Sequence, residues 1–191
     1  MLLQALYERE PELHSHLQGV AELAGEVGRT LELDDAAMEE LARAAILHDI
    51  GKIAIPDQIL HKPGPLADEE WVFVRQHSVV GERILGASIA LRPIGRIVRA
   101  THERWDGTGY PDGLTGEEIP MEARIVFACD AFAAMTAERP YRPALAPAQA
   151  VAELERCAGS QFAPRVGAAL VSAVTGRGST AGADRQHARR A

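Results

Sequence analysis

Apolar residues recur every three or four positions along most of this sequence, which places them on one face of a helix. The clearest face lies early in the chain and consists of Leu13, His16, Leu17, Val20, Leu23 and Val27. Similar faces are predicted within residues 35–50, 92–102 and 121–137, and two shorter helices after Pro147 and Pro164. A helix predicted from Asp68 has an inner face made of Phe73, Val74, His77, Gly81 and Ile84. No useful length of sequence alternates apolar with polar residues, so the predicted fold class is all-α.

The length of 191 residues suits one domain with a hydrophobic core and is short for two. We expect a single helical bundle over residues 1–174. Residues 175–191 are polar, small and Gly-rich, and this composition predicts a disordered tail.

Charge and composition exclude several function classes. The formal net charge of −7 argues against binding to DNA or RNA. No run approaches about 18 apolar residues, which argues against membrane insertion. The N-terminus lacks the apolar stretch of a signal peptide, so a cytoplasmic protein is expected. Cys129 and Cys157 have no CxxC spacing, which predicts neither a thiolate metal site nor a disulfide framework.

Ionisable residues occupy the apolar faces of five predicted helices. They are His16, His48, His77, His102 and Asp130. Alone, each has an ordinary explanation, because an inward histidine or aspartate is usually a hydrogen-bonded core residue. Burying five such groups in one core is costly unless something compensates. Neutral imidazole and carboxylate are metal ligands, so the pattern predicts that these side chains meet around metal.

Asp49 directly follows His48, and neighbouring side chains on a helix point about 100° apart. At a helix end facing the cluster, His48 can bind one ion while Asp49 bridges two, which predicts two divalent ions roughly 3.5–4 Å apart. Ligands without sulfur favour Fe or Mn, with Zn, Co and Mg as alternatives. A site with one ion or with three ions remains an alternative to two. Lys52 is either a solvated surface residue or a phosphate contact. Glu12, one turn before His16, is either a surface residue or a ligand of a further ion.

The stretch DGTGYPDGLTG, residues 106–116, holds four glycines in eleven residues. A loop of this kind is more elaborate than a plain surface turn, which favours the interpretation that it forms part of the wall of the metal site. Tyr110 either stacks on a base or packs the loop down. Arg139 and Arg142 follow the helix of Asp130 and are either solvated charges or contacts at the edge of the site.

Three stretches resemble the HD-GYP domains, a branch of the HD metal-phosphohydrolase superfamily. They are LHDIGKIAIPDQILHKPGPL, HERWDGTGYPDGLTGEEIP and ARIVFACDAFAAMTAERPYR. His48 and Asp49 match the HD pair, and Gly109 to Pro111 match the GYP signature. The resemblance implies an HD-domain-like helical bundle with a Gly-rich GYP loop. It also implies hydrolysis of cyclic di-GMP to linear pGpG or GMP with two or three metal ions, frequently iron or manganese.

Carried over by position, the resemblance implies two sets of metal ligands. The first set is His16, His48, Asp49 and Asp130. The second set is Asp49, His77 and His102. Glu12 stands where some members place a ligand of a third ion. The implied catalytic residues are Asp49 and Lys52, and the implied substrate contacts are Lys52, Gly109, Tyr110, Arg139 and Arg142.

The sequence departs from the family pattern at three positions. Thr101 replaces a usual ligand histidine, Ala133 replaces a common aspartate, and Leu17 replaces a common serine. Loss of one ligand predicts weaker binding of the second ion and reduced activity.

Two alternatives stay open beside the phosphodiesterase. They are a weakened member that binds cyclic di-GMP or a protein as a signalling module, and a phosphohydrolase for another nucleotide. Besides cyclic di-GMP, the expected partners are a sensory, receiver or GGDEF-type protein and a second copy of the chain. Any regulatory signal is expected to arrive from such a partner or from a preceding segment.

Overall fold

The computed structural model describes the backbone of residues 2–138 and 143–187, and side chains up to residue 176 within those ranges. These ranges hold helices and loops and no β-strand, with isolated bridges at Asp106–Thr115 and Ala158–Phe162. The α-helices are α1 (Leu2–Arg9), α2 (Leu13–Thr30), α3 (Asp35–Leu47), α4 (Asp57–Leu60), α5 (Asp68–Arg75), α6 (His77–Gly86), α7 (Arg92–Arg99), α8 (Met121–Thr136), α9 (Pro147–Arg156) and α10 (Pro164–His187). Short 3-10 helices are η1 (Ile50–Ala54), η2 (Ile89–Leu91) and η3 (Gly116–Glu118). The predicted all-α fold class is confirmed.

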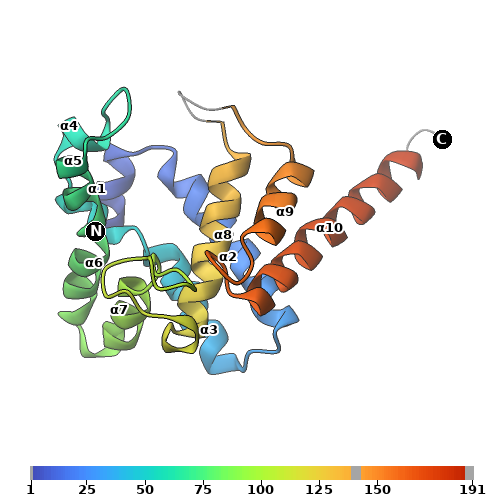
Figure 1. Cartoon of the computed structure of the whole chain (residues 1–191), viewed down its shortest axis with the longest axis horizontal. Coiled ribbons are helices and arrows are strands. Elements are labelled where there is room, and N and C mark those ends of the chain that lie inside the picture. The colour runs from blue at the N-terminus through green and yellow to red at the C-terminus, as the bar shows by residue number, and fades with distance from the viewer. Residues whose placement is uncertain (1, 139–142, 188–191) are drawn as a thin grey trace.

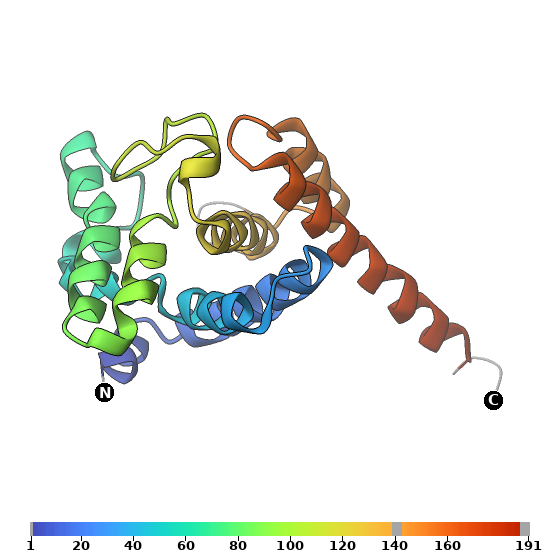
Figure 2. The same ribbon diagram turned by 90° about the horizontal axis from the view of Figure 1, so that it is seen from below.

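Helix α8 runs through the middle of the molecule (Figure 1). Figure 2 shows it end-on, with α2 and α3 on one side and α9 and α10 on another. Its buried residues are Ala123, Arg124, Ile125, Val126, Ala128 and Cys129. They span several faces because the helix is covered from several sides. The packing of α8 therefore fixes the position of Asp130, which lies on the same helix.

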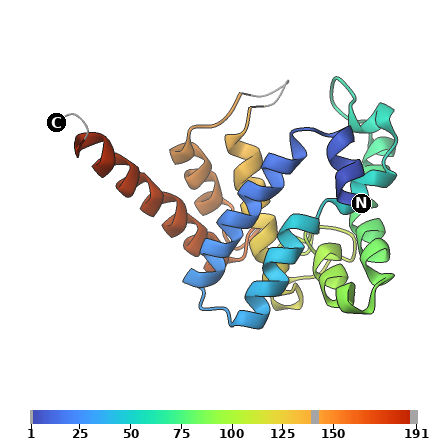
Figure 3. The same ribbon diagram turned by 180° about the vertical axis from the view of Figure 1, so that it is seen from behind.

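Helices α2 and α3 lie side by side and cover α8 from behind (Figure 3). The sequence offers both Asp34 and Asp35 as caps for this helix, and the structure distinguishes them. The carboxylate of Asp34 accepts a hydrogen bond from the backbone N–H of Ala37 at 2.9 Å, so Asp34 caps α3. Because glycine often follows the last residue of a helix, the sequence predicts that this helix ends at Gly51. That prediction is wrong. Helix α3 ends at Leu47, and Gly51 lies inside η1.

Gly51 serves instead as a point of close contact between η1 and α6. A Cβ atom at this position would lie 1.9 Å from the carbonyl oxygen of His77 and 2.7 Å from the backbone nitrogen of Gly81. Only glycine allows two backbones to approach so closely. This contact holds the segment that follows Asp49 against the start of α6.

The single helix predicted from Asp68 is divided into α5 and α6 by Gln76. His77 and Gly81 are buried, as predicted, but Phe73 is 50% exposed, so its predicted inward position is wrong. The break at Gln76 removes α5 from the register of α6, and none of the residues of α5 is buried.

Helix α10 continues to His187 and so includes residues 175–187, for which the sequence predicts a disordered tail. The domain boundary at residue 174 stays a prediction. Within the described ranges, no helix combines the length and the apolarity needed to cross a bilayer.

Candidate metal centre

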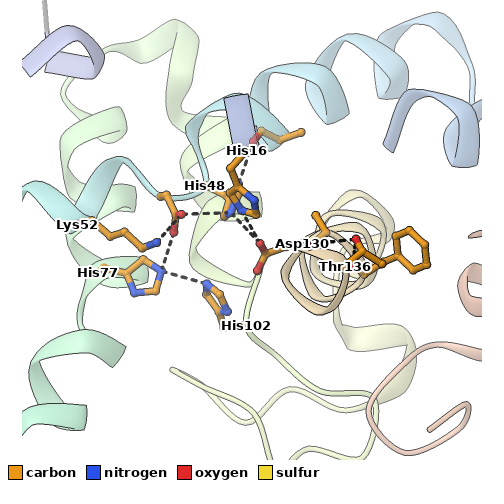
Figure 4. Close-up of polar contacts among 11 residues, drawn as sticks. His16, His48, Lys52, His77, His102, Asp130 and Thr136 are labelled. Carbon is orange, nitrogen blue, oxygen red and sulfur yellow. Dashed lines mark hydrogen bonds and ion pairs between the residues drawn. The ribbon is translucent and has the colours of Figure 1, made fainter. Parts of the chain in front are cut away.

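Histidine and aspartate side chains from α2, α6, α8 and the segments after α3 and α7 converge at one place (Figure 4). They form two groups, in each of which the nitrogen and oxygen atoms lie within 4.8 Å of one another. The first group is His16, His48 and Asp49, and the second is Asp49, His77 and His102. The structure therefore brings the predicted histidines together and makes Asp49 a member of both groups.

The two carboxylate oxygens of Asp49 face different partners. Oδ2 lies 3.6 Å from Nε2 of His48, and Oδ1 lies 3.7 Å from Nε2 of His77. Asp130 lies beside the first group, since its Oδ1 is 2.9 Å from Nε2 of His16 and 3.9 Å from Nε2 of His48. A carboxylate with one oxygen toward each group has the geometry of a bridging ligand.

The histidine tautomers leave nitrogen lone pairs pointing into the site. Nδ1 of His48 lies 2.9 Å from the carbonyl oxygen of Ala45, and Nδ1 of His77 lies 2.5 Å from that of Val74. Because a carbonyl only accepts, each Nδ1 carries the proton and each Nε2 is unprotonated when the ring is neutral. The buried Nε2 of His48 has no hydrogen-bond partner in the described residues. A cation would satisfy this atom, and a carbonyl behind the ring is the usual support of a metal-bound histidine.

Burial keeps the histidines of the second group neutral. It lowers the pKa of His102 to about 3, and the neighbouring His77 adds to this effect. Burial also lowers the pKa of His77, although the carboxylate of Asp49 acts in the opposite direction. The two rings meet at their Nε2 atoms, which are 3.0 Å apart. Neutral imidazoles are the form that binds metal, so this pair is ready to accept an ion near neutral pH.

The two aspartates are ionised because neighbouring groups outweigh the effect of burial on their pKa values. Burial alone would raise the pKa of Asp49, but the positive charge and the hydrogen bond of Lys52 outweigh it and hold the pKa well below its usual range. Burial would likewise raise the pKa of Asp130, but the hydrogen bond with His16 helps to lower it to about 2. Nζ of Lys52 lies 2.7 Å from Oδ2 of Asp49. Burial would lower the pKa of Lys52, but Asp49 raises it, so the ammonium stays charged beside the site.

The GYP loop closes one side of the second group. A Cβ atom on Gly109 would lie 2.3 Å from the backbone nitrogen of Arg104, so the loop passes too close to the chain for any other residue. The ring of Tyr110 stacks on that of His102, with centroids 5.1 Å apart and planes 8° from parallel. The predicted position of this loop as a wall beside the ligand cluster agrees with these contacts.

A protein-family model described as an HD domain matches residues 1–166. This chain belongs to the HD domain family. The family resemblance stated from the HD pair and its surrounding sequence is thereby confirmed.

Several characterised HD-domain relatives share about two fifths of the aligned residues. The cyclic di-GMP phosphodiesterase of Thermotoga maritima is 41% identical over 160 residues, which cover 83% of this chain and 44% of that protein. The cyclic di-GMP phosphodiesterase response regulator RpfG of Xanthomonas campestris is 38% identical, over 95% of this chain and 50% of that protein. The 3'3'-cGAMP-specific phosphodiesterase 3 of Vibrio cholerae is 39% identical, over 87% of this chain and 36% of that protein. The chain thus spans half or less of the length of these relatives.

Solved structures show the same fold. The HDG"Y"P protein Bd1817 of Bdellovibrio bacteriovorus superimposes with a TM-score of 0.66 at 18% identity, over 85% of this chain and 52% of that one. The HD domain of the phosphodiesterase PgpH of L. monocytogenes gives a TM-score of 0.65 at 17% identity, over 92% of this chain and 97% of that one. At this identity the comparison supports the helical architecture of the HD domain.

The remaining positions that the sequence analysis singled out do not belong to the two ligand groups. Glu12 is exposed and belongs to neither ligand group. Thr101 is buried, and its hydroxyl donates a hydrogen bond to the carbonyl oxygen of Val98 at 2.8 Å. Arg139 and Arg142 lie outside the described residues.

Glu103 is a functional candidate that the sequence analysis missed. Its side chain is 1% exposed, and its two oxygens accept hydrogen bonds from the backbone N–H groups of Asp112 at 2.7 Å, Gly113 at 3.1 Å and Leu114 at 3.1 Å. This carboxylate therefore fixes residues 112–114 of the GYP loop to the segment that carries His102. The sequence offers no signal for it, because the bonded groups are backbone atoms nine to eleven positions away.

Proposed function

We propose that this HD domain is a metal-dependent phosphodiesterase that hydrolyses cyclic di-GMP to linear pGpG, GMP or both. The observation that carries the proposal is the pair of ligand groups sharing Asp49, with the unsatisfied Nε2 of His48 pointing into it. Carboxylate and imidazole around adjoining sites are typical of two-metal phosphoesterases. The activities named for the relatives from Thermotoga and Xanthomonas support the choice of substrate.

The two proposed ions would be held by side chains already in place. The proposed first set is His16, His48, Asp49 and Asp130, and the proposed second set is Asp49, His77 and His102. Nitrogen and oxygen donors without sulfur favour Fe or Mn, while Zn, Co and Mg also fit this donor type. We propose two ions, because Asp49 has one oxygen toward each group.

When bound, the ions would supply a water of lowered pKa and positive charge to offset that of the phosphate. The chain does the remaining work by positioning. Asp49 and the neutral rings of His77 and His102 hold their donor atoms in fixed directions. Lys52 places a half-buried ammonium beside the cluster, where it offsets the charge of Asp49 and of an entering phosphate. Tyr110 supports His102 from one side, and Arg139 and Arg142 remain proposed contacts to the substrate.

Hydrolysis by purified protein tests the proposal. With added Mn²⁺ or Fe²⁺, cyclic di-GMP should give linear pGpG or GMP on chromatography, and chelation should stop the reaction until metal is restored. His48→Ala should abolish turnover, whereas His61→Ala, a loop histidine that is half exposed, should not. Absence of turnover in protein shown to hold metal, or equal rates in His48→Ala and wild type, would refute the assignment.

A binding module is the second candidate, and Thr101 and Ala133 favour it. Tight binding of cyclic di-GMP without hydrolysis, in metal-replete protein, would decide for that function. The relative from Vibrio cholerae that is specific for 3'3'-cGAMP makes this dinucleotide the first alternative substrate to assay.

Thr101→His is expected to raise the metal content of the purified protein. A threonine hydroxyl is a weak neutral ligand, and this one already donates its hydrogen to Val98. An added imidazole next to His102 would supply the donor that the HD-GYP pattern implies at this position. Thr101→Val keeps the size of the side chain and should leave the metal content unchanged. Elemental analysis of folded protein checks both variants, and equal metal content in Thr101→His and wild type would remove this account of position 101.

A further inference from the structure

Helix α5 exposes large side chains that the fold does not use. Trp71 is 41% exposed and Phe73 is 50% exposed, and no residue of the helix is buried. An exposed aromatic ring offers a flat apolar surface on which a base can stack. The question is which side of this helix faces the metal centre.

Arg75, the last residue of α5, identifies that side. The central carbon of its guanidinium lies 5.7 Å from the centre of the Tyr110 ring. The same ring stacks on His102 of the second ligand group, and Arg75 precedes His77 of that group by two residues. Arg75 therefore lies at the edge of the proposed active site, one aromatic ring away from a candidate metal ligand.

The guanidinium of Arg75 contrasts with that of Arg99. Arg99 is paired with both Asp112 and Glu82, with N···O distances of 2.6 and 2.8 Å. Within the described part of the chain, Arg75 has no ion pair and no hydrogen bond to another side chain, and it is exposed. Its N–H donors are thus available to a ligand, while Tyr110 limits the directions that the guanidinium can take.

Trp71 lies four residues before Arg75, which places the two side chains on the same face of α5. An indole and a planar guanidinium next to each other match a purine base better than a phosphate. The indole offers a stacking surface for any base, and the guanidinium offers paired donors that fit O6 and N7 of guanine. Adenine has an amino group in place of O6, so it cannot accept both bonds.

We propose that Trp71 and Arg75 form the binding site for a guanine base of the dinucleotide, with Trp71 stacking on the base and Arg75 reading its edge. This inference rests on the proposed function, because it assumes that the scissile phosphate lies at the metal centre. It makes Arg75 a determinant of preference for guanine over adenine, and Trp71 a contact that does not distinguish them.

Affinity measurements on two variants separate these roles. Metal-loaded protein is titrated with hydrolysis-resistant phosphorothioate analogues of cyclic di-GMP and cyclic di-AMP. Arg75→Met should weaken the guanine analogue by roughly 5- to 150-fold, the range for one bidentate base contact, and change the adenine analogue less than about threefold. Trp71→Ala should weaken both analogues to a similar degree, by roughly 5- to 150-fold. Arg96→Met alters another exposed arginine and Val72→Ala another exposed apolar residue of α5, and neither should change either affinity.

Three results would overturn the inference. The first is equal weakening of both analogues in Arg75→Met, which would indicate a phosphate contact. The second is unchanged affinity for the guanine analogue in Arg75→Met. The third is failure of the wild type to bind either analogue. Hydrolysis of the natural dinucleotides is measured in parallel. If the wild type binds the guanine analogue through Arg75 but hydrolyses nothing, the proposed function fails and the base site stands.

Discussion

Asp49→Asn is expected to reduce the hydrolysis of cyclic di-GMP by more than about 100-fold and to lower the metal content from two ions per chain to one or none. Disturbing an outer partner of a metal ligand already costs about 10- to 100-fold, and Asp49 is proposed to contact both ions directly. Asparagine keeps the size of the side chain but offers a neutral amide, and one of its two terminal atoms can no longer accept. Elemental analysis and a turnover assay on the same sample check both effects.

The matched control for this variant is Asp35→Asn. Asp35 is exposed in the first turn of α3 and lies outside both ligand groups. It should keep wild-type metal content and rate. Added Mn²⁺ should raise the melting temperatures of Asp35→Asn and the wild type equally, and should raise that of Asp49→Asn much less. Full metal content in Asp49→Asn would contradict the bridging role.

Gly51→Ala is expected to have the largest effect on stability. The added Cβ would meet two backbone atoms of α6, at 1.9 Å from the carbonyl oxygen of His77 and 2.7 Å from the nitrogen of Gly81. Overpacking against side chains costs about 1–3 kcal/mol, and backbone atoms give way less easily. We therefore expect the free energy of unfolding to fall by about 3 kcal/mol or more in urea titrations. Metal binding should weaken as well, because η1 and α6 move apart and separate Asp49 from His77.

Gly19→Ala is the control for this substitution. Gly19 lies within α2 with no atom within 4 Å of an added Cβ, so alanine should raise the free energy of unfolding by about 0.5–1 kcal/mol through its better helix propensity. If Gly51→Ala proved as stable as Gly19→Ala, the close contact between η1 and α6 would be wrong.

The positions of the candidate ligand histidines follow from local periodicity, which explains why they were predictable. Each of His16, His48, His77 and His102 repeats the spacing of the apolar residues around it. A side chain on the apolar face of a helix is directed toward the core, as its apolar neighbours are. Asp130 was predictable for the same reason. Such a pattern can be recognised within one segment of the sequence, without information about the segments that pack against it.

Features that depend on contacts between distant segments were not predictable. The exposure of Phe73 follows from a break at Gln76 that the apolar spacing does not reveal. The role of Gly51 depends on a backbone that arrives from α6, and the bonds of Glu103 go to backbone atoms of the loop. Arg75 became a candidate only when Tyr110 was found beside it. Side-chain identity carries little information about such tertiary contacts.

Anomalous scattering from a crystal of the Mn²⁺- or Fe²⁺-loaded protein tests the central claim most directly. The account predicts two peaks roughly 3.5–4 Å apart, with one oxygen of Asp49 bound to each. One peak should be bound by His16, His48 and Asp130, and the other by His77 and His102. A single peak that lacks Asp49, or peaks bound elsewhere while these side chains keep only each other as partners, would contradict it.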